Sequence, residues 1–383
     1  MFSRFIPFLA TLAFGQSVCR AEPLGVTAAL QPFVDAHSLA GAVGLVASKD
    51  QVLSVETVGF ADIAASKPMT ADALFWIASQ SKPMTATAFM MLVDEGKVSV
   101  DDRVEKYLPE FKGQMFTAEQ DENHALLKKP SHPITVRNVL SHTSGLRFAS
   151  PMEQPTLDAL PLRDAVRSHA LLPLQWEPDS KYQYSNAGIN TAARIIEVVS
   201  GMTYEDFMQK RLFDPLGMKD TTFWPSEEQV RRLAKSYKPN ADKSGLEETT
   251  ISQLTYPLSD RKRQPMPAGG LFSTAQDVAR FCQMILNGGT LDGRRYLSEA
   301  AVKQMTIKQT GDALKEGYGL GWSVNGTQFG HGGAMATNMN IDPERGLISV
   351  WMVQHAGFPG EGGKSRDVFQ RAAEARFGRG AGR

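Results

Sequence analysis

Cysteine is almost absent from this chain, which has two cysteines, Cys19 and Cys282, among 383 residues. Cys19 lies in an N-terminal segment that we expect to be removed, so the remaining chain cannot form an internal disulfide. Its stability must come from a packed core. Cys282 lies among apolar residues at helical spacing, which favours buried packing over a role as a nucleophile.

An excess of charge of either sign is also lacking, because 41 lysines and arginines balance 41 aspartates and glutamates. A neutral chain has no electrostatic reason to bind nucleic acid or an anionic membrane, and we expect neither as a partner. The hydrophobic content of 42% is typical of a globular protein with a large core.

Long apolar runs are missing, apart from a short one near the N-terminus. The stretch 6–15 follows Arg4 and is too short to cross a bilayer. It predicts a signal peptide over residues 1–21 and a mature domain over residues 22–383. The alternatives are lipidation of Cys19 and an ordinary N-terminal membrane anchor. We therefore expect a periplasmic or secreted protein with no stable membrane anchor after signal cleavage.

Several common catalytic signatures are absent. The sequence contains no G-x-S-x-G, no H-E-x-x-H, no G-x-G-x-x-G and no P-loop. The usual marks of α/β-hydrolases, zinc proteases and nucleotide-dependent enzymes are therefore missing.

The most informative motif that is present is Ser79-Gln-Ser-Lys82, which opens an apolar run that closes at Gly96. The run predicts a helix, on which Ser79 and Lys82 share one face. An amine there can accept the proton of the serine hydroxyl, and the helix N-terminus favours developing negative charge. The same spacing at Ser259–Lys262 lies in a polar stretch without helical periodicity, and we interpret it as chance.

Two further motifs could complete such chemistry. Tyr184-Ser-Asn186 precedes a predicted helix, and offers a second acid/base group and an amide; the alternative is a buried aromatic residue beside a helix cap. His331-Gly332-Gly333 follows a predicted strand. Its glycines would let a substrate approach, and the N–H of Ala334 could donate to an oxyanion; the alternative is a glycine-rich turn with a surface histidine.

His142, in Leu140-Ser-His-Thr-Ser-Gly145, invites a serine–histidine interpretation. No carboxylate is placed by the motif to orient this imidazole, so we interpret His142 as a structural loop residue. A rival polar pair, Ser323 and Asn325, is explained by a hairpin turn.

The hydropathy pattern predicts an α/β (α+β) fold. Strand patterns lie near both chain ends, and helical patterns dominate between them, which implies one antiparallel sheet flanked by helices with a large, mostly helical insertion. The α/β part would comprise about 22–78 and 312–383, and the helical part about 79–311. Residues 112–133 and 235–266 are predicted to be loops.

The order S-x-x-K, Tyr-x-Asn and a glycine-containing strand triplet resembles the class C β-lactamase and penicillin-binding-protein-like serine hydrolase family, which includes DD-peptidases, D-aminopeptidases and carboxylesterases. The resemblance covers nearly the whole mature chain and implies a β-lactamase/DD-peptidase-like fold. It also includes Asp214-Pro-Leu-Gly-Met218 and Ala268-Gly-Gly-Leu-Phe-Ser273.

This resemblance implies a role for each motif. Ser79 would be the acylated nucleophile, and Lys82 and Tyr184 would be the acid/base groups, with the choice of the first base left open. The resemblance assigns the substrate to Asn186, to the His331-Gly332-Gly333 strand, and to an oxyanion hole formed by the N–H groups of Ser79 and Ala334. It implies no metal or organic cofactor.

One departure concerns the third motif. The β-lactamases carry Lys-Thr-Gly where this chain has His331-Gly332-Gly333, so a full positive charge and a hydroxyl are lost. We therefore predict an exported serine hydrolase that cleaves small-molecule esters, amides or peptide-like substrates through a Ser79 acyl-enzyme. The alternatives are a DD-peptidase or D-aminopeptidase, a weak β-lactamase, and a non-catalytic binding or scaffold protein.

Overall fold

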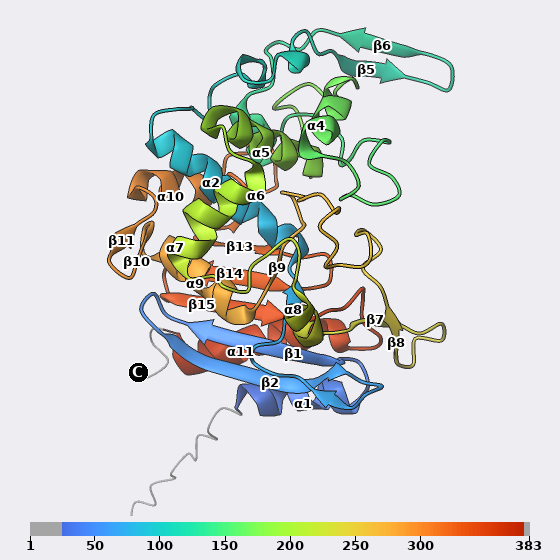
Figure 1. Ribbon diagram of the computed structural model, residues 1–383, viewed down its shortest axis with the longest axis vertical. Helices are drawn as coiled ribbons and strands as arrows, with labels where there is room; N and C mark the ends of the chain where they lie inside the picture. The colour runs from blue at the N-terminus through green and yellow to red at the C-terminus, as the bar shows by residue number, and fades with distance from the viewer. Residues whose placement is uncertain (1–24, 379–383) are drawn as a thin grey trace, which may run out of the picture.

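The predicted antiparallel sheet built from both chain ends is the centre of the computed structural model, which describes residues 25–378. Seven strands lie in the order β12-β13-β14-β15-β1-β2-β3 (Figure 1). The C-terminal strand β15 pairs with the N-terminal strand β1 in antiparallel register, with Leu45 opposite Val350. This pairing confirms the predicted fold class. The predicted signal peptide lies outside the described residues.

The main sheet consists of β1 (Gly41–Ala47), β2 (Val52–Asp62), β3 (Lys67–Pro68), β12 (Ser323–Asn325), β13 (Gln328–Gly332), β14 (Asn338–Asp342) and β15 (Leu347–Met352). The helices are α1 (Val26–Asp35), α2 (Ser81–Asp94), α3 (Val136–Ser141), α4 (Leu162–Ala170), α5 (Asn186–Ser200), α6 (Tyr204–Met208), α7 (Asp214–Leu216), α8 (Glu227–Arg232), α9 (Ala275–Leu286), α10 (Glu299–Thr306) and α11 (Ser365–Phe377). Among residues 25–378, none of these helices combines the length and the apolar character needed to cross a membrane.

Helices cover both faces of the sheet. Helices α1 and α11 pack on one face, where Trp351 and Phe369 lie 5.3 Å apart between ring centroids, and α9 packs on the other (Figure 1). Every residue of β1 is buried as a result. Gly44 permits the close approach of α11, because a Cβ atom there would lie 2.5 Å from the Phe369 ring.

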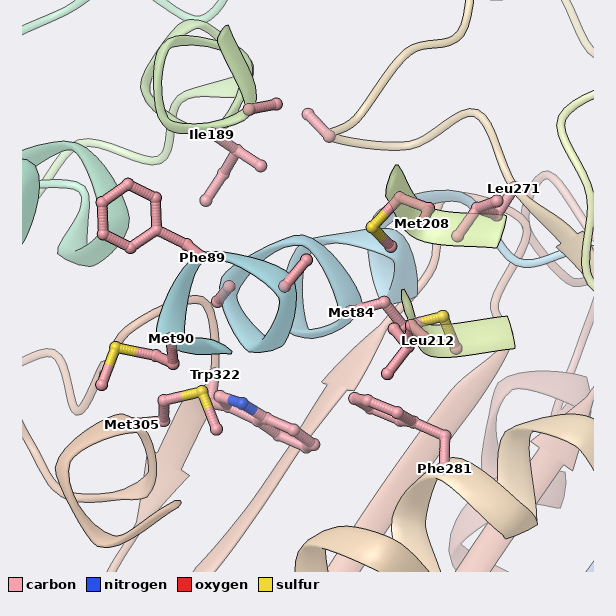
Figure 2. Close-up of a cluster of buried hydrophobic side chains, with 14 of the residues drawn as sticks. Met84, Phe89, Met90, Ile189, Met208, Leu212, Leu271, Phe281, Met305 and Trp322 are labelled. Atoms are coloured by element: carbon pink, nitrogen blue, oxygen red, sulfur yellow. The ribbon is translucent and has the colours of Figure 1, made fainter. Parts of the chain in front are cut away.

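Helix α2 runs through the middle of the molecule and is surrounded by apolar side chains (Figure 2). Twelve of its fourteen residues are buried, so it lacks the polar face of a surface helix. Its neighbours come from α5, from α6 and the turn after it, from α9, and from the segment before β12, and include Ile189, Met208, Leu212, Phe281 and Trp322. Packing on all sides fixes the start of this helix, which carries the S-x-x-K motif.

Two local predictions were wrong, because two segments expected to be loops contain strands. Residues 112–133 contain a hairpin, β5 (Phe116–Gln120) with β6 (Ala125–Lys128), and 235–266 contain β7 (Ser236–Pro239) with β8 (Leu246–Thr249). The short strand before Ser79, β4 (Phe75–Trp76), pairs with β9 (Phe272–Ser273) and not with the main sheet. A last pair joins β10 (Thr290–Leu291) to β11 (Arg294–Arg295). Backbone hydrogen bonds hold the β5–β6 and β7–β8 hairpins, and β6 and β8 contain no buried residue, so their sequences lack apolar alternation.

A buried ion pair outside the helices provides a test of this packing. Arg263 Nε lies 2.7 Å from Asp158 Oδ2, and the two side chains are 2% and 0% exposed. We expect Asp158→Ala to lower the free energy of unfolding by about 3–5 kcal/mol, because Arg263 would remain charged and unpaired in the interior. Thermal and urea denaturation measure the loss.

The exposed pair Lys235–Glu248, at 2.7 Å, is the matched control. Glu248→Ala should change the free energy of unfolding by less than about 1 kcal/mol. Equal effects of the two substitutions would contradict the assignment of the buried pair.

Candidate active site

Ser79 lies at a tight junction between β4 and α2. A 3₁₀ turn spans Ala78–Gln80, and α2 begins at Ser81, so Ser79 precedes the helix by two residues instead of opening it. Ala78 has a φ of 46°, a left-handed conformation that costs a residue other than glycine free energy. The surrounding buried core holds this turn in place and leaves the side chain of Ser79 half-buried.

Lys82 extends from the first turn of α2 into the interior and is 0% exposed. Its Nζ lies 2.8 Å from Asn186 Oδ1, 2.8 Å from the carbonyl oxygen of Ala268, and 3.1 Å from Ser79 Oγ. Both an amide oxygen and a carbonyl oxygen only accept hydrogen bonds. A neutral amine would donate its two N–H groups to these oxygens and keep its lone pair for the hydroxyl of Ser79.

The electrostatic setting of Lys82 favours the neutral amine. Complete burial lowers the pKa of Lys82 well below its usual value, because the charged form loses its hydration. The lysine of the predicted pair is thus placed where it can accept a proton from Ser79.

Tyr184 lies against the same atoms. Its ring centroid is 4.5 Å from Lys82 Nζ. Burial raises the pKa of Tyr184 to about 12, and a hydrogen bond with Ser79 partly opposes this rise. The phenol is therefore protonated at neutral pH. The structure thus brings Ser79, Lys82 and Tyr184 together.

Asn186 is the first residue of α5, and this position fixes the direction of its side chain. The preceding residue, Ser185, caps the helix by accepting the N–H of Gly188 at 3.1 Å. Asn186 itself is buried and accepts from Lys82. The alternative of a capping asparagine is therefore wrong, because the serine is the cap.

Sequence reasoning did not identify the backbone segment 267–271 as part of the site. The carbonyl of Pro267 accepts from Thr85 at 2.9 Å, the carbonyl of Ala268 accepts from Lys82, and the N–H of Leu271 donates to Ser81 at 3.3 Å. The segment contributes mainly backbone atoms, which leave no side-chain signal. The Ala268-Gly-Gly motif was the one indication in the sequence that this segment belongs to the site.

His331 lies within β13 and is buried, so the alternative of a surface histidine is wrong. Its Nδ1 lies 2.7 Å from the carbonyl oxygen of Gly332, which can only accept, so Nδ1 carries the proton. Its Nε2 then accepts the hydroxyl of Tyr318 at 2.9 Å. Burial lowers the pKa of His331 to about 3, and the ring is neutral at pH 7.

The glycines after His331 bring β13 close to the strand that leads into Ser79. A Cβ atom on Gly333 would lie 2.2 Å from Thr337 Oγ1 and 2.5 Å from the carbonyl oxygen of Ile77. The N–H of Gly333 donates to Thr337 at 2.7 Å. Within residues 25–378, the N–H groups of Ser79 and of the exposed Ala334 have no hydrogen-bond acceptor.

The fold and the junction at Ser79 together define a class: a sheet from both chain ends, a helical insertion, and a serine and a lysine three residues apart beside the central helix are the features of β-lactamase-type proteins. A family model described as Beta-lactamase matches residues 26–373. The chain belongs to the beta-lactamase family.

Relatives in this family carry several names. Protein Rv1367c of Mycobacterium tuberculosis is 32% identical over 373 residues, covering 86% of this chain and 90% of the relative. Penicillin-binding protein 4 of Amycolatopsis lactamdurans is 30% identical and covers 74% and 72%. A lovastatin esterase of Penicillium rubens is 28% identical and covers 64% and 62%.

Solved structures support the same fold. EstCE1, described as a hydrolase with promiscuous acyltransferase activity, has a TM-score of 0.76 at 24% identity, covering 91% of this chain and 97% of that chain. Simvastatin synthase (LovD) from Aspergillus terreus has a TM-score of 0.76 at 19% identity and covers 92% and 98%. At these identities the similarity concerns the fold.

Gly333 provides a test of the close approach at this site. We expect Gly333→Ala to lower the free energy of unfolding by about 1–3 kcal/mol, because the new methyl group must displace Thr337 or the strand before Ser79. Gly332→Ala is the control: its Cβ would lie no closer than 3.7 Å to other atoms. Its effect should stay within about 0.5 kcal/mol. Denaturation curves that do not separate the two variants would overturn the assignment.

Proposed function

We propose that this protein is a serine hydrolase that cleaves esters or small amides through an acyl-enzyme on Ser79. One observation carries the proposal: the Ser79 hydroxyl lies 3.1 Å from a buried lysine amine, and the ring of Tyr184 lies against that same amine, with its centroid 4.5 Å from Lys82 Nζ. A nucleophile within hydrogen-bond reach of a neutral base, itself oriented by further groups, is the arrangement that acyl transfer requires.

In the proposed acylation step, neutral Lys82 accepts the proton of Ser79 as Oγ attacks the substrate carbonyl. Tyr184, protonated at neutral pH, then donates its proton to the leaving alcohol or amine as the carbonyl–heteroatom bond breaks. Protonated Lys82 restores the phenol proton. Water repeats the sequence on the acyl-enzyme, releases the acid and regenerates Ser79.

We assign stabilisation of the tetrahedral intermediate to the N–H groups of Ser79 and Ala334. Both lack acceptors within the described residues, and the close approach of Gly333 to Ile77 brings their segments together. A pair of such donors contributes a large share of catalysis in acyl transfer. Asn186 would contact the substrate while it holds Lys82.

The proposed substrate lacks a carboxylate near the reacting bond. His331 is neutral and both of its ring nitrogens have partners, so it offers neither charge nor a free donor to such a group. Gly332 has no hydroxyl. Phe148, which is 45% exposed, stacks on the Tyr184 ring at 6.3 Å and adds an apolar surface. We therefore assign His331 and Gly332 to the wall of the site.

The second candidate is a DD-peptidase, a D-aminopeptidase or a weak β-lactamase. It is favoured by the relative named penicillin-binding protein 4, which is 30% identical. Release of D-alanine from muropeptide mimics, or turnover of nitrocefin above that of p-nitrophenyl butyrate, would select this candidate.

We further propose export by the signal peptide, which N-terminal sequencing of the mature protein from the periplasm or medium checks.

Ser79→Ala tests the nucleophile. We expect the wild-type protein to hydrolyse p-nitrophenyl butyrate and to gain one adduct from a fluorophosphonate in intact-mass measurements. Ser79→Ala should lose at least about a thousandfold in kcat and form no adduct, because the acyl-enzyme cannot form. Ser259→Ala, in the other S-x-x-K, is the matched control and should behave as wild type. A wild-type protein without adduct and turnover would favour a non-catalytic binding role.

The lowered pKa of Lys82 predicts the pH dependence. Because the neutral amine is the active form, kcat/KM should be constant above the pKa of Lys82 and fall tenfold per pH unit below it. Tyr184, with a pKa raised to about 12, should cause no loss of activity between pH 7 and 10. Lys82→Arg, which stays charged, should be inactive throughout. An activity that rises as the pH falls below 7 would contradict Lys82 as the base.

A further inference from the structure

His142 contacts the backbone on both sides of Tyr184. It follows α3 as the residue that ends this helix, with a φ of 62°, and it is 1% exposed. Its carbonyl oxygen accepts the N–H of Gln183 at 2.8 Å, and its Nδ1 accepts the N–H of Ser185 at 3.2 Å. The residues immediately before and after Tyr184 are thus both bound to one histidine.

The imidazole also packs against the Tyr184 ring itself. The ring centroid of His142 lies 4.6 Å from those of Tyr184 and Tyr318 and 5.8 Å from that of Tyr182. Tyr318 is in turn held by its hydrogen bond to His331. The ring of Tyr184 therefore rests on a layer of side chains that are themselves fixed.

The hydrogen bonds of His142 exclude a role as the base for Ser79. Nδ1 accepts from a backbone N–H, so a neutral ring carries its proton on Nε2 and has no lone pair left. Nε2 is buried and has no hydrogen-bond partner within the described residues. Burial lowers the pKa of His142 well below its usual value, in keeping with this neutral form.

We propose that His142 is a positioning residue that holds the Tyr184 phenol against Ser79 and thereby sets the rate of proton delivery to the leaving group. This inference rests on the proposed function, in which Tyr184 is the proton donor. Its direct consequence is a dependence on the leaving group. A p-nitrophenolate leaves without protonation, whereas an alkoxide needs the proton, so loss of position should slow alkyl esters selectively.

The test compares hydrolysis of p-nitrophenyl butyrate and ethyl butyrate by His142→Phe and His142→Asn. His142→Phe keeps an aromatic ring but loses the acceptor for Ser185. We expect its kcat for the ethyl ester to fall about tenfold to a hundredfold, and its kcat for the nitrophenyl ester to fall less than about threefold. KM should change less than about twofold for both esters, because the groups proposed to bind the carbonyl remain.

His142→Asn separates position from folding. Asparagine accepts the left-handed backbone conformation and supplies an oxygen near the site of Nδ1. His142→Asn should recover at least half of the decrease in log kcat for ethyl butyrate that His142→Phe causes. The control is His355→Phe: this buried histidine also accepts a backbone N–H, that of Ala40 at 3.1 Å, but its ring stacks on Phe358. His355→Phe should lower kcat for both esters by the same factor, or leave both unchanged.

The outcomes separate this inference from the proposed function. If His142→Phe lowers both kcat values in parallel with thermal stability, or if neither changes, the positioning role is overturned while the serine hydrolase stands. If Tyr184→Phe lowers kcat for the two esters by the same factor, the proton-donor role fails, and the inference fails with it. If the wild-type protein turns over neither ester and forms no fluorophosphonate adduct, the proposed function itself is wrong.

Discussion

The structure depends on the burial of one lysine amine. Lys82 is 0% exposed. At that depth, a charged or neutral amine without hydrogen-bond partners would cost several kcal/mol. Its three contacts come from separate parts of the chain: the turn at Ser79, the start of α5 at Asn186, and the backbone at Ala268. Satisfying this amine therefore fixes the relative positions of these segments, and the side chain that would serve chemistry also organises the site around it.

The surrounding fold makes that arrangement rigid. Helix α2 is buried on all sides, so it cannot rotate without losing its packing (Figure 2) and the contacts of Lys82 and Thr85 with residues 267–268. At its start, Ala78 holds a left-handed conformation, and Thr85 anchors the carbonyl of Pro267 one turn beyond Lys82. The same packing that stabilises the domain thus maintains the local strain beside Ser79, which an exposed loop would relax.

How much of this could be predicted from the sequence depended on whether side chains carried the signal. The pairing of Ser79 with Lys82 follows from helical spacing, and the sheet follows from strand patterns at both ends of the chain. The role of Ala268 does not, because it acts through a backbone carbonyl. Nor could the sequence show that both ring nitrogens of His331 have hydrogen-bond partners. The partner of Nε2 is Tyr318, which the antiparallel β12–β13 pairing and its flanking turn bring near. The β5–β6 hairpin has an exposed strand without apolar alternation.

The neutral state of the groups around Ser79 follows from the same burial. His142 and His331 each accept a hydrogen bond on one nitrogen, which requires an unprotonated atom, and Tyr184 keeps its proton to a pKa of about 12. In this set, Lys82 is the group placed to take up the proton of Ser79, because its amine lies 3.1 Å from that hydroxyl and two oxygens already face its N–H groups. Proton transfer from Ser79 to Lys82 would therefore create an ion pair within a neutral surround, where opposite charges attract more strongly than in water. Such a surround favours the transition state of acyl transfer while offering no fixed charge to a carboxylate on the substrate, so the proposed base and the proposed preference for uncharged esters have one physical cause.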